Sequence, residues 1–427
     1  MAMAQGSGRR RSLGALRHRD YRWYFASGMG MSAAQGIQDL AITWLVLDLT
    51  ESLSTLVLVI FVRGLTMLTF GLFGGAFADR YSRRNLLIVN QVLTLANMAA
   101  IALLVFGDQV QIWQVYGSSL MLGLTTALTG PARTALIRSL VPREDMLNAV
   151  ALNSFQMNLS RIVWPTLAGV LIAITGTGGA FAVCAIASVF GIVFILPVRD
   201  TLGHVQTGQR SSAFGDVKDG LRYIWSIPTL AMIMTMILLV GMFGLCFQTL
   251  ASAFARESME FDSKEAGFFL MAAGIGAIIG STLLIAREVK NRNLLFMQTI
   301  FGFGASVFLL ALNPTFIGAY LLMGVFGVFS AMTPVLAQTI FQVGVPQQYL
   351  GRVNSLFMIG PGLAAMLTLP VGIVGDLLTL RVAIAGIAAI LMLIPIGAAV
   401  LGLHHRQLAE PEPDARDDRR LAGAAAD

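Results

Sequence analysis

Charge is scarce in this sequence: Asp, Glu, Lys and Arg make up 12% of its 427 residues, about half the usual share in soluble proteins. Hydrophobic residues make up 56%, and the mean hydropathy is +0.75. A soluble core stops growing at about 250–300 residues, so one buried core cannot hold this many apolar side chains. The composition excludes an ordinary soluble protein and predicts a surface largely covered by lipid.

Cysteine and histidine are also scarce. Cys184 and Cys246 lie in separate apolar stretches, and the four histidines flank such stretches. These residues do not have the spacing of metal ligands, and the apolar stretches hold no serine–histidine–aspartate or cysteine–histidine arrangement. We therefore expect no metal, no cofactor and no enzymatic activity.

Apolar stretches long enough to cross a bilayer fill most of the chain. A spanning helix satisfies its backbone polar groups internally, whereas barrel strands would alternate apolar and polar residues. At about 20 residues for each span, the continuous stretches predict an all-α membrane protein of about twelve transmembrane helices. The predicted spans are 22–47, 53–78, 85–106, 112–138, 147–174, 179–197, 228–252, 265–286, 293–312, 315–341, 348–376 and 380–402.

The basic residues predict an orientation with both termini in the cytoplasm. The segments then placed outside hold only Arg256, Lys264 and Arg381 as basic residues. This bias follows the positive-inside rule and accounts for the net charge of +6 without a nucleic-acid partner. The predicted domains are a tail (1–20), a six-helix half (21–198), a cytoplasmic linker (199–226), a second six-helix half (227–403) and a disordered tail (404–427).

Two short matches indicate an internal repeat. Arg84-Asn-Leu-Leu87 recurs as Arg292-Asn-Leu-Leu295, and Pro131 with Val141-Pro142 recurs as Pro334 with Val345-Pro346. Both matches have an offset of roughly 205 residues and occupy equivalent places in the predicted topology. Two related halves place a binding site near the membrane midplane between them.

A basic loop joins predicted spans 2 and 3 and reads Gly75-Ala-Phe-Ala-Asp79-Arg80-Tyr-Ser-Arg83-Arg84. Gly75 allows a neighbouring helix to approach closely, and Asp79 at a helix end can face the positive end of another helix. The three arginines hold the loop in the cytoplasm and can pair with acids such as Glu144 and Asp145. An ordinary positive-inside loop is the alternative interpretation.

This loop resembles the loop motif of the major facilitator superfamily, with Ser82 in place of its second glycine. Two further segments, from Pro131 to Pro165 and from Val345 to Ser355, resemble a branch of drug and siderophore exporters related to macrolide-efflux and enterobactin-export proteins. One departure is Trp164, where that branch usually has glycine. The other is that span 4 lacks the membrane arginine that some antiporter branches place there, since the nearest, Arg133, lies near the cytoplasmic end of the span.

The resemblance covers roughly residues 15–402 and implies a monomeric two-half transporter of a bacterial inner membrane. It implies export of amphipathic small molecules (a drug, macrolide or siderophore) by alternating access and proton antiport. It also assigns a role in conformational gating to Gly75, Asp79, Arg80, Arg83, Arg84 and Arg352. The alternative functions are a lipid or lysolipid flippase or an uncoupled facilitator on the same fold, and a receptor that binds without transport.

Three charged residues fall deep within predicted spans: Asp39, Arg63 and Arg161. A charge at the bilayer centre costs about 2.5–3.5 kcal/mol even on the insertion scale, so each needs a partner or water. Asp39 lies as far before Glu51 as Arg63 lies after it, which predicts a similar depth in an antiparallel hairpin. One interpretation is a static pair that locks two helices. Another is that Asp39 carries a proton and that Arg63 or Arg161 tunes its pKa. The third is that these groups contact the substrate.

Polar residues on spans that face the cavity of such a fold are candidate substrate contacts. They are Gln35, Gln38, Asn153, Gln156, Gln248 and Gln338. Hydrogen bonding between helices is the alternative for each of them.

Overall fold

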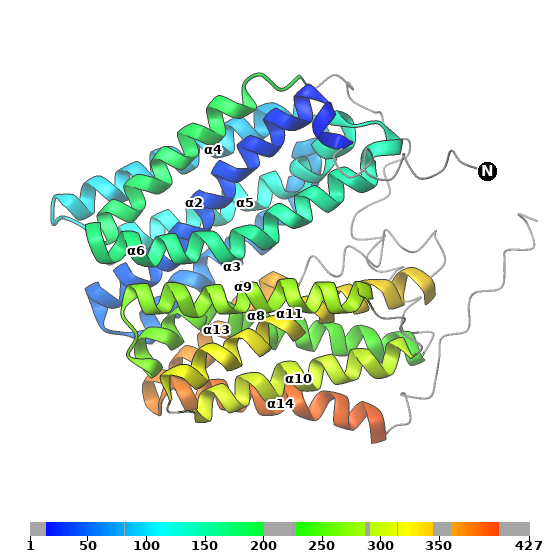
Figure 1. Ribbon diagram of the computed structural model, residues 1–427. Coiled ribbons are helices and arrows are strands. Elements are labelled where there is room, and N and C mark those ends of the chain that lie inside the picture. Colours follow the sequence, from blue (N-terminus) through cyan, green and yellow to red (C-terminus); the bar gives the residue numbers. More distant parts are fainter. Residues whose placement is uncertain are drawn as a thin grey trace, which may run out of the picture.

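The computed structural model describes residues 14–80, 82–199, 225, 228–286, 291–313, 315–344 and 360–400. For some of them it describes the backbone alone, including residues 72–80, 161, 228–230, 341–344 and 360–363. All regular structure in this part of the chain is helical, which confirms the predicted fold class (Figure 1). The elements are η1 (Ala15–Arg17), α2 (Arg19–Thr50), α3 (Leu53–Arg80), α4 (Arg83–Phe106), α5 (Ile112–Leu140), η2 (Arg143–Asp145), α6 (Met146–Ile195), α8 (Pro228–Met259), α9 (Ser263–Ala286), α10 (Arg292–Leu312), α11 (Phe316–Gly344), α13 (Gly360–Leu377) and α14 (Leu380–Val400).

The helices follow the predicted spans closely. Helix α6 contains both the fifth and the sixth predicted span. Gly176, with a φ of 71° and a ψ of −178°, breaks the helix between them. Residues with a side chain rarely adopt this conformation, so the turn between these two spans depends on glycine. Helix α8 runs beyond its predicted end, to Met259, and the predicted span 348–376 begins outside the described residues.

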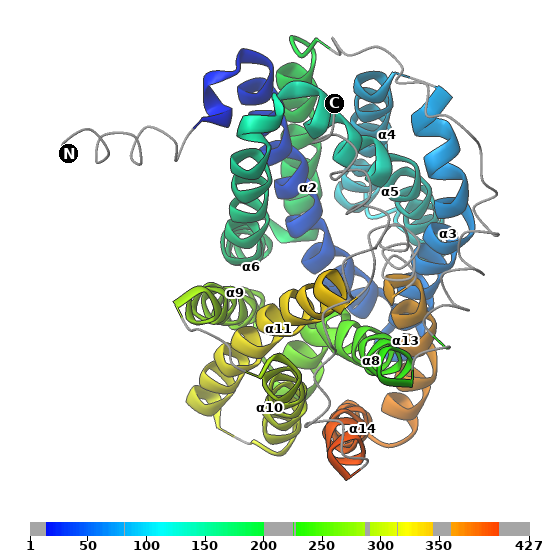
Figure 2. The same cartoon turned by 90° about the vertical axis from the view of Figure 1, so that its right-hand side faces the viewer.

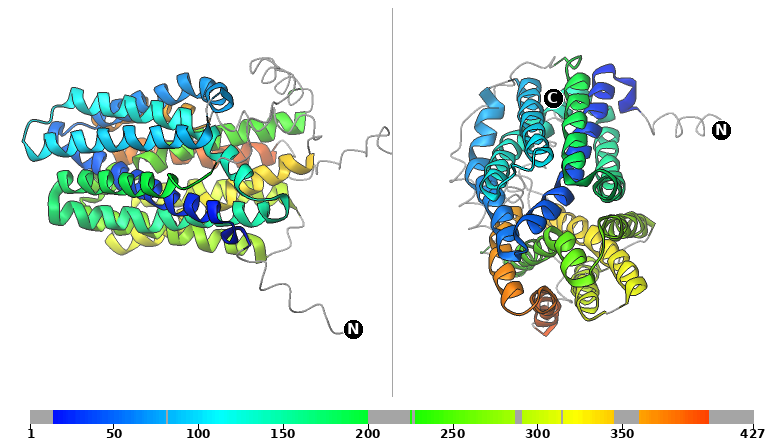
Figure 3. Two further views of the ribbon diagram at one scale, coloured as in Figure 1. Left: turned by 90° about the horizontal axis from the view of Figure 1, so that it is seen from above. Right: turned by 90° about the vertical axis from the view of Figure 1, so that its left-hand side faces the viewer.

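The helices are roughly aligned, so the bundle has two ends (Figures 1 and 3). We call the end with the turns at Glu51, Asp108, Gly176 and Glu260 the closed end, for contacts described below. The opposite end, where α2 begins and α3 and α4 meet, is the tail end. The predicted linker 199–226 (apart from residues 199 and 225) and the predicted tail 404–427 lie outside the described residues.

The bundle consists of two halves, α2–α6 and α8–α14 (Figure 2). In the first half α2 and α4 pack on α6 and α3 packs on α5; in the second, α9 packs on α11 and α10 on α14. Helix α6 meets α9 along one seam between the halves, and α3 meets α13 along the other. Helices α2 and α8 meet between these seams.

Eight helical segments of the described chain are long and apolar enough to cross a membrane. Helices α2 and α5 are not among them, because each carries many polar residues. Several of these are buried within the bundle, such as Gln38 and Thr43 on α2 and Thr125 and Thr129 on α5. The two helices are therefore interior elements whose polar groups face protein or water rather than lipid.

Candidate functional site

An ion pair joins α2 and α3 partway along their length. Arg63 Nη1 lies 2.7 Å from Asp39 Oδ1, and 27% of the arginine side chain and 54% of the aspartate side chain are exposed. The α2–α3 turn at Glu51 brings the two residues to the same depth, because each lies the same number of residues from it. The predicted pairing is confirmed, while the predicted role in proton transfer stays a prediction.

The exposure of the Asp39 side chain indicates whether it faces lipid or the second half. Helix α2 packs against α3, α5 and α6 of its own half and against α8 of the other half. A half-exposed carboxylate on such a helix does not face hydrocarbon, because a charge there would cost several kcal/mol. Four residues later, on the same face of the helix, Thr43 contacts Ser252 of α8, so the exposed part of Asp39 lies on the side of α2 that faces the second half.

At the closed end, α2 and α8 are joined directly. The hydroxyls of Thr43 and Ser252 are 2.9 Å apart, and Arg256 Nη2 lies 2.7 Å from Asp48 Oδ1. Arg256 Nη1 also donates to the carbonyl of Trp44 at 3.1 Å, and its guanidinium lies 5.5 Å from the centroid of the Trp44 ring. These contacts hold the first helix of one half to the first helix of the other.

Asp376 makes a second connection between the halves at the closed end. This residue is in the last turn of α13, and its carboxylate accepts hydrogen bonds from the backbone of Leu53 at 3.1 Å and of Ser54 at 2.8 Å. Both N–H groups belong to the first turn of α3, whose N–H groups have no partner within the helix. A carboxylate there is also favoured by the positive end of the helix dipole.

The seam between α6 and α9 is closed by small residues. An ideal Cβ placed on Gly267 would lie 2.8 Å from the carbonyl oxygen of Pro165, and one on Gly169 would overlap the backbone of Ser263. The two backbones therefore touch without intervening side chains. The hydrogen bonds and ion pairs between the halves that are described above all lie toward the closed end.

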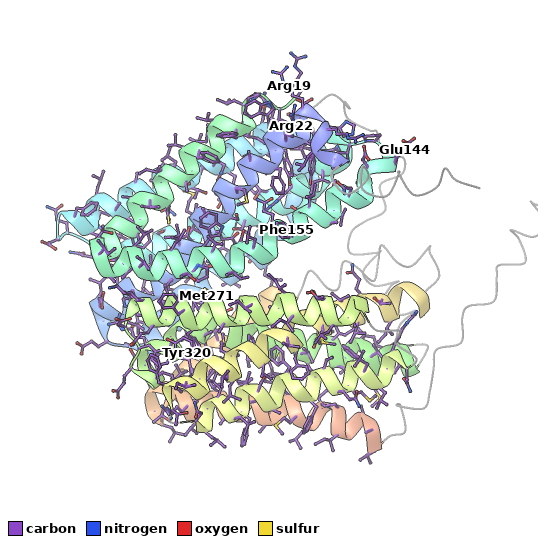
Figure 4. All side chains as sticks on the ribbon, viewed as in Figure 1. Arg19, Arg22, Glu144, Phe155, Met271 and Tyr320 are labelled. Carbon is purple, nitrogen blue, oxygen red and sulfur yellow. The ribbon has the colours of Figure 1, made fainter. Side chains whose placement is uncertain are left out.

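At the tail end, polar contacts join elements of the first half to one another. His18 Nε2 lies 2.7 Å from Asp145 Oδ2, the N–H of Ala15 donates to Asn148 at 3.0 Å, and the Tyr21 hydroxyl donates to the carbonyl of Ala149 at 2.8 Å. The start of α2 is thereby attached to the start of α6. Charged side chains such as Arg19, Arg22 and Glu144 gather at this end (Figure 4).

The expected pairing of the loop arginines with Asp145 is wrong for Arg84. Its guanidinium donates to the carbonyls of Ile195 and Leu196 at the end of α6, whereas Asp145 pairs with His18. The last carbonyls of a helix lack partners within it and attract cations, which explains this preference. Gly75, Asp79 and Arg80 lie in α3 without described side chains, and Arg352 lies outside the described residues, as does the side chain of Arg161.

The predicted substrate contacts fall into two groups. Gln35, Gln248 and Gln338 are exposed and Asn153 is half-buried. Gln38 and Gln156 are buried, and an ideal Cβ on Gly28 would lie 2.7 Å from Gln156 Nε2. Gln156 Nε2 has no hydrogen-bond partner in the described part of the chain, so hydrogen bonding between helices stays a prediction for these buried amides. The exposed amides remain candidates for contact with a substrate.

Sequence reasoning missed the contacts of the closed end. Arg256 entered only as one of three basic residues in the outer segments, and Asp48, Ser252 and Asp376 had no assigned role. Their partners lie far away in the sequence, on the other half, so no local pattern relates them. The scarcity of basic residues near the predicted outer ends was one available signal.

The sequence profile described as "Transmembrane secretion effector" (MFS_3) matches residues 11–421. The chain is 22% identical over 359 residues to the staphyloferrin A transporter of Staphylococcus aureus, covering 83% of this chain and 89% of that protein. It is 24% identical over 344 residues to the enterobactin exporter EntS of Salmonella paratyphi A, covering 80% and 81%.

Solved structures share the fold at low sequence identity. A POT family transporter in complex with 5-aminolevulinic acid superposes with a TM-score of 0.71 and 14% identity, covering 93% of this chain and 97% of the other. A variant of the nucleoside transporter NupG gives a TM-score of 0.72 and 11% identity, covering 89% and 99%. With a profile that spans almost the whole sequence, the chain belongs to the transmembrane secretion effector family of the major facilitator superfamily, and it is a membrane transporter rather than an enzyme.

Proposed function

We propose that this transporter exports amphipathic small molecules across a bacterial inner membrane by proton antiport, with both termini in the cytoplasm. The ion pair of Asp39 and Arg63 is the observation that carries the proposal. Asp39 is a half-exposed carboxylate within the predicted first span, so water can reach it, and Arg63 is its partner at 2.7 Å. A substrate that displaces the arginine would favour proton uptake by Asp39.

The contacts between the halves support the proposal of alternating access. In the proposed orientation the closed end faces outward, and the hydrogen bonds and ion pairs there seal that side. The space beside Asp39 would open to the cytoplasm, from which a substrate enters. Breaking the closed-end contacts and rocking the halves about the central site would expose that site to the outside.

The kind of substrate is proposed from the relatives. The two described above transport staphyloferrin A and enterobactin, which are siderophores, so we include siderophores with macrolides and dyes among the compounds to be tested. The exposed amides Gln35, Gln248 and Gln338 would hydrogen-bond the polar part of such a molecule.

The first test is proton movement in liposomes that contain the purified full-length protein and a pH-sensitive dye. Addition of dyes, macrolides, siderophores or lysolipids should move protons only for transported compounds. The Asp39→Asn variant keeps the size of the side chain and a hydrogen-bond acceptor for Arg63, but it cannot exchange a proton. We expect it to reduce the number of protons moved per substrate at least about tenfold.

Asp48→Asn is the matched control, because Asp48 also forms a 2.7 Å pair with an arginine and is equally half-exposed. It should alter the transport rate but retain the ratio of protons to substrate. If Asp39→Asn moved as many protons per substrate as the wild type, Asp39 would not be the proton carrier. If substrate crossed without proton movement, the protein would be a facilitator or a lipid flippase, and the pair would be a static lock.

A further inference from the structure

A half-open cavity of about 230 Å³ lies in the second half, lined by α8, α10 and α11. Its wall is mainly apolar and includes Ile237, Leu245, Phe303 and Ala337. None of its lining residues is charged. An apolar cavity of about 150 Å³ holds benzene, so this one has room for a substituted aromatic ring or a branched alkyl group. The lining favours a neutral occupant over an ion.

The polar groups of this cavity are few and mostly hydrogen-bond acceptors. Pro334 on α11 has no N–H, so it cannot donate to the carbonyl of Ser330 four residues earlier, and both residues line the cavity. The hydroxyls of Ser330 and Thr333 donate within α11, to Gly327 at 3.0 Å and Phe329 at 2.8 Å, which leaves their oxygen lone pairs as acceptors. An occupant with a hydroxyl or amine donor would satisfy this wall.

Gln248 connects the cavity to the space between the halves. It is exposed, lines the cavity and has no hydrogen-bond partner for its amide among the described residues. It lies one turn before Ser252 on α8, and residues four apart share a helix face. Because Ser252 contacts Thr43 of the other half, Gln248 lies on the side of α8 that faces α2.

Asp39 occupies the equivalent position on α2. It precedes Thr43 by the same four residues, and α2 and α8 both run toward the closed end. Asp39 and Gln248 therefore lie at the same depth, each about 6 Å along its helix from the Thr43–Ser252 contact. A molecule between the halves can place a polar or cationic end near Asp39 and an apolar end in the cavity.

From this arrangement we infer that the α8–α10–α11 cavity is a binding subsite for a neutral, ring-sized apolar group that carries a hydrogen-bond donor, with Gln248 at its mouth. The inference rests on the proposed function only in taking this group to be part of the transported molecule. The subsite selects one end of an amphipathic substrate, and the pair of Asp39 and Arg63 faces the other end.

A photoactivatable benzyl alcohol, which is a neutral ring with one hydroxyl, tests the subsite in the full-length protein in lipid nanodiscs. Mass spectrometry should find the label on the lining segments of α8 and α11. Naphthol should displace it roughly fivefold to tenfold better than methoxynaphthalene, which lacks the donor. Thr333→Val, which removes one of the acceptors on α11, should reduce this preference, whereas Gln248→Leu at the mouth should leave it.

Ala337→Leu fills the cavity and should reduce labelling severalfold, whereas the same substitution at the exposed Ala399 of α14 should leave it unchanged. Thermal unfolding, followed with a thiol-reactive dye on the buried Cys184 and Cys246, checks that each variant is folded. Equal labelling of wild type and a folded Ala337→Leu, or label confined to lipid-facing residues, would overturn the subsite. Equal competition by the two naphthalenes in the wild type would overturn the requirement for a donor.

These measurements need no proton gradient, so their outcome is independent of antiport. Labelling of the cavity in a protein that moves no protons would remove the proposed coupling and keep the subsite. Proton-coupled transport without labelling of the cavity would keep the proposed coupling and overturn the subsite.

Discussion

Trp164 illustrates how one side chain sets the contact between two spanning helices. An ideal Cβ on Gly36 of α2 would lie 2.6 Å from Trp164 Cβ on α6, and the indole N–H donates to Ser32 at 3.2 Å. The residue that departs from the usual glycine of the exporter branch is therefore accommodated by a glycine on the facing helix. The local sequence shows the tryptophan but not the position opposite it.

Gly36→Ala should destabilise the protein, because its methyl group cannot fit against Trp164 without a shift of α2 or α6. Overpacking of this kind typically costs about 1–3 kcal/mol, and the apparent melting temperature should fall by several degrees. Unfolding can be followed through the reaction of the buried Cys184 and Cys246 with a thiol-reactive dye.

Two comparisons isolate that contact. Gly117→Ala is the matched control, since an ideal Cβ on Gly117 has nothing within 4 Å, and it should leave the melting temperature unchanged or raise it slightly. In a Trp164→Gly background, Gly36→Ala should cost little further stability, because the Cβ that its methyl group would meet is gone. Equal losses from the two alanines, in that background as well, would mean that helix packing at Gly36 does not depend on Trp164.

At the scale of the helices, α3 and α13 form an antiparallel pair across the halves in which Asp376 caps the start of α3. Removing an N-cap side chain costs about 1 kcal/mol, and here the cap is present only while the halves touch at the closed end. Asp376→Ala should therefore shift the population toward states with that end open, by roughly fivefold.

Spin labels on Gln109→Cys of the first half and Lys264→Cys of the second would report this shift, because the native cysteines are buried. Asp376→Ala should increase the fraction of long distances. Asp262 is the matched control, since it accepts from the N–H of Glu265 at 2.7 Å and caps α9 within its own half. An equal shift in Asp262→Ala would attribute the change to lost helix stability rather than to the contact between halves.

At the scale of the whole molecule, the features that could be predicted from the sequence are those that depend on residues near one another in the chain. Apolar stretches located the spans, and the equal distances of Asp39 and Arg63 from Glu51 anticipated their ion pair. The contacts of Arg256 and Asp376 involve residues of the other half, and their geometry depends on how the two halves dock. No sequence period encodes that docking, so the closed end and the α8–α10–α11 cavity required the structure.

The docking leads to a prediction for the whole molecule: transport requires the closed end to separate. Thr43 and Ser252 have hydroxyl oxygens 2.9 Å apart, so cysteines at both positions lie close enough for a disulfide after a small adjustment. Oxidation of the double variant, with Cys184 and Cys246 replaced by alanine, should abolish transport in liposomes. Reductant should restore the rate measured before oxidation.

Each single cysteine variant, treated with the same oxidant, shows whether inhibition requires the bond itself. A probe bound beside Asp39 from the tail end should still bind to the locked protein, because the disulfide closes only the opposite side. Loss of transport with binding retained is the result that rocking about a central site demands. Undiminished transport by the fully cross-linked protein would show that substrate leaves without separation of α2 from α8, and the alternating-access part of the proposal would fall.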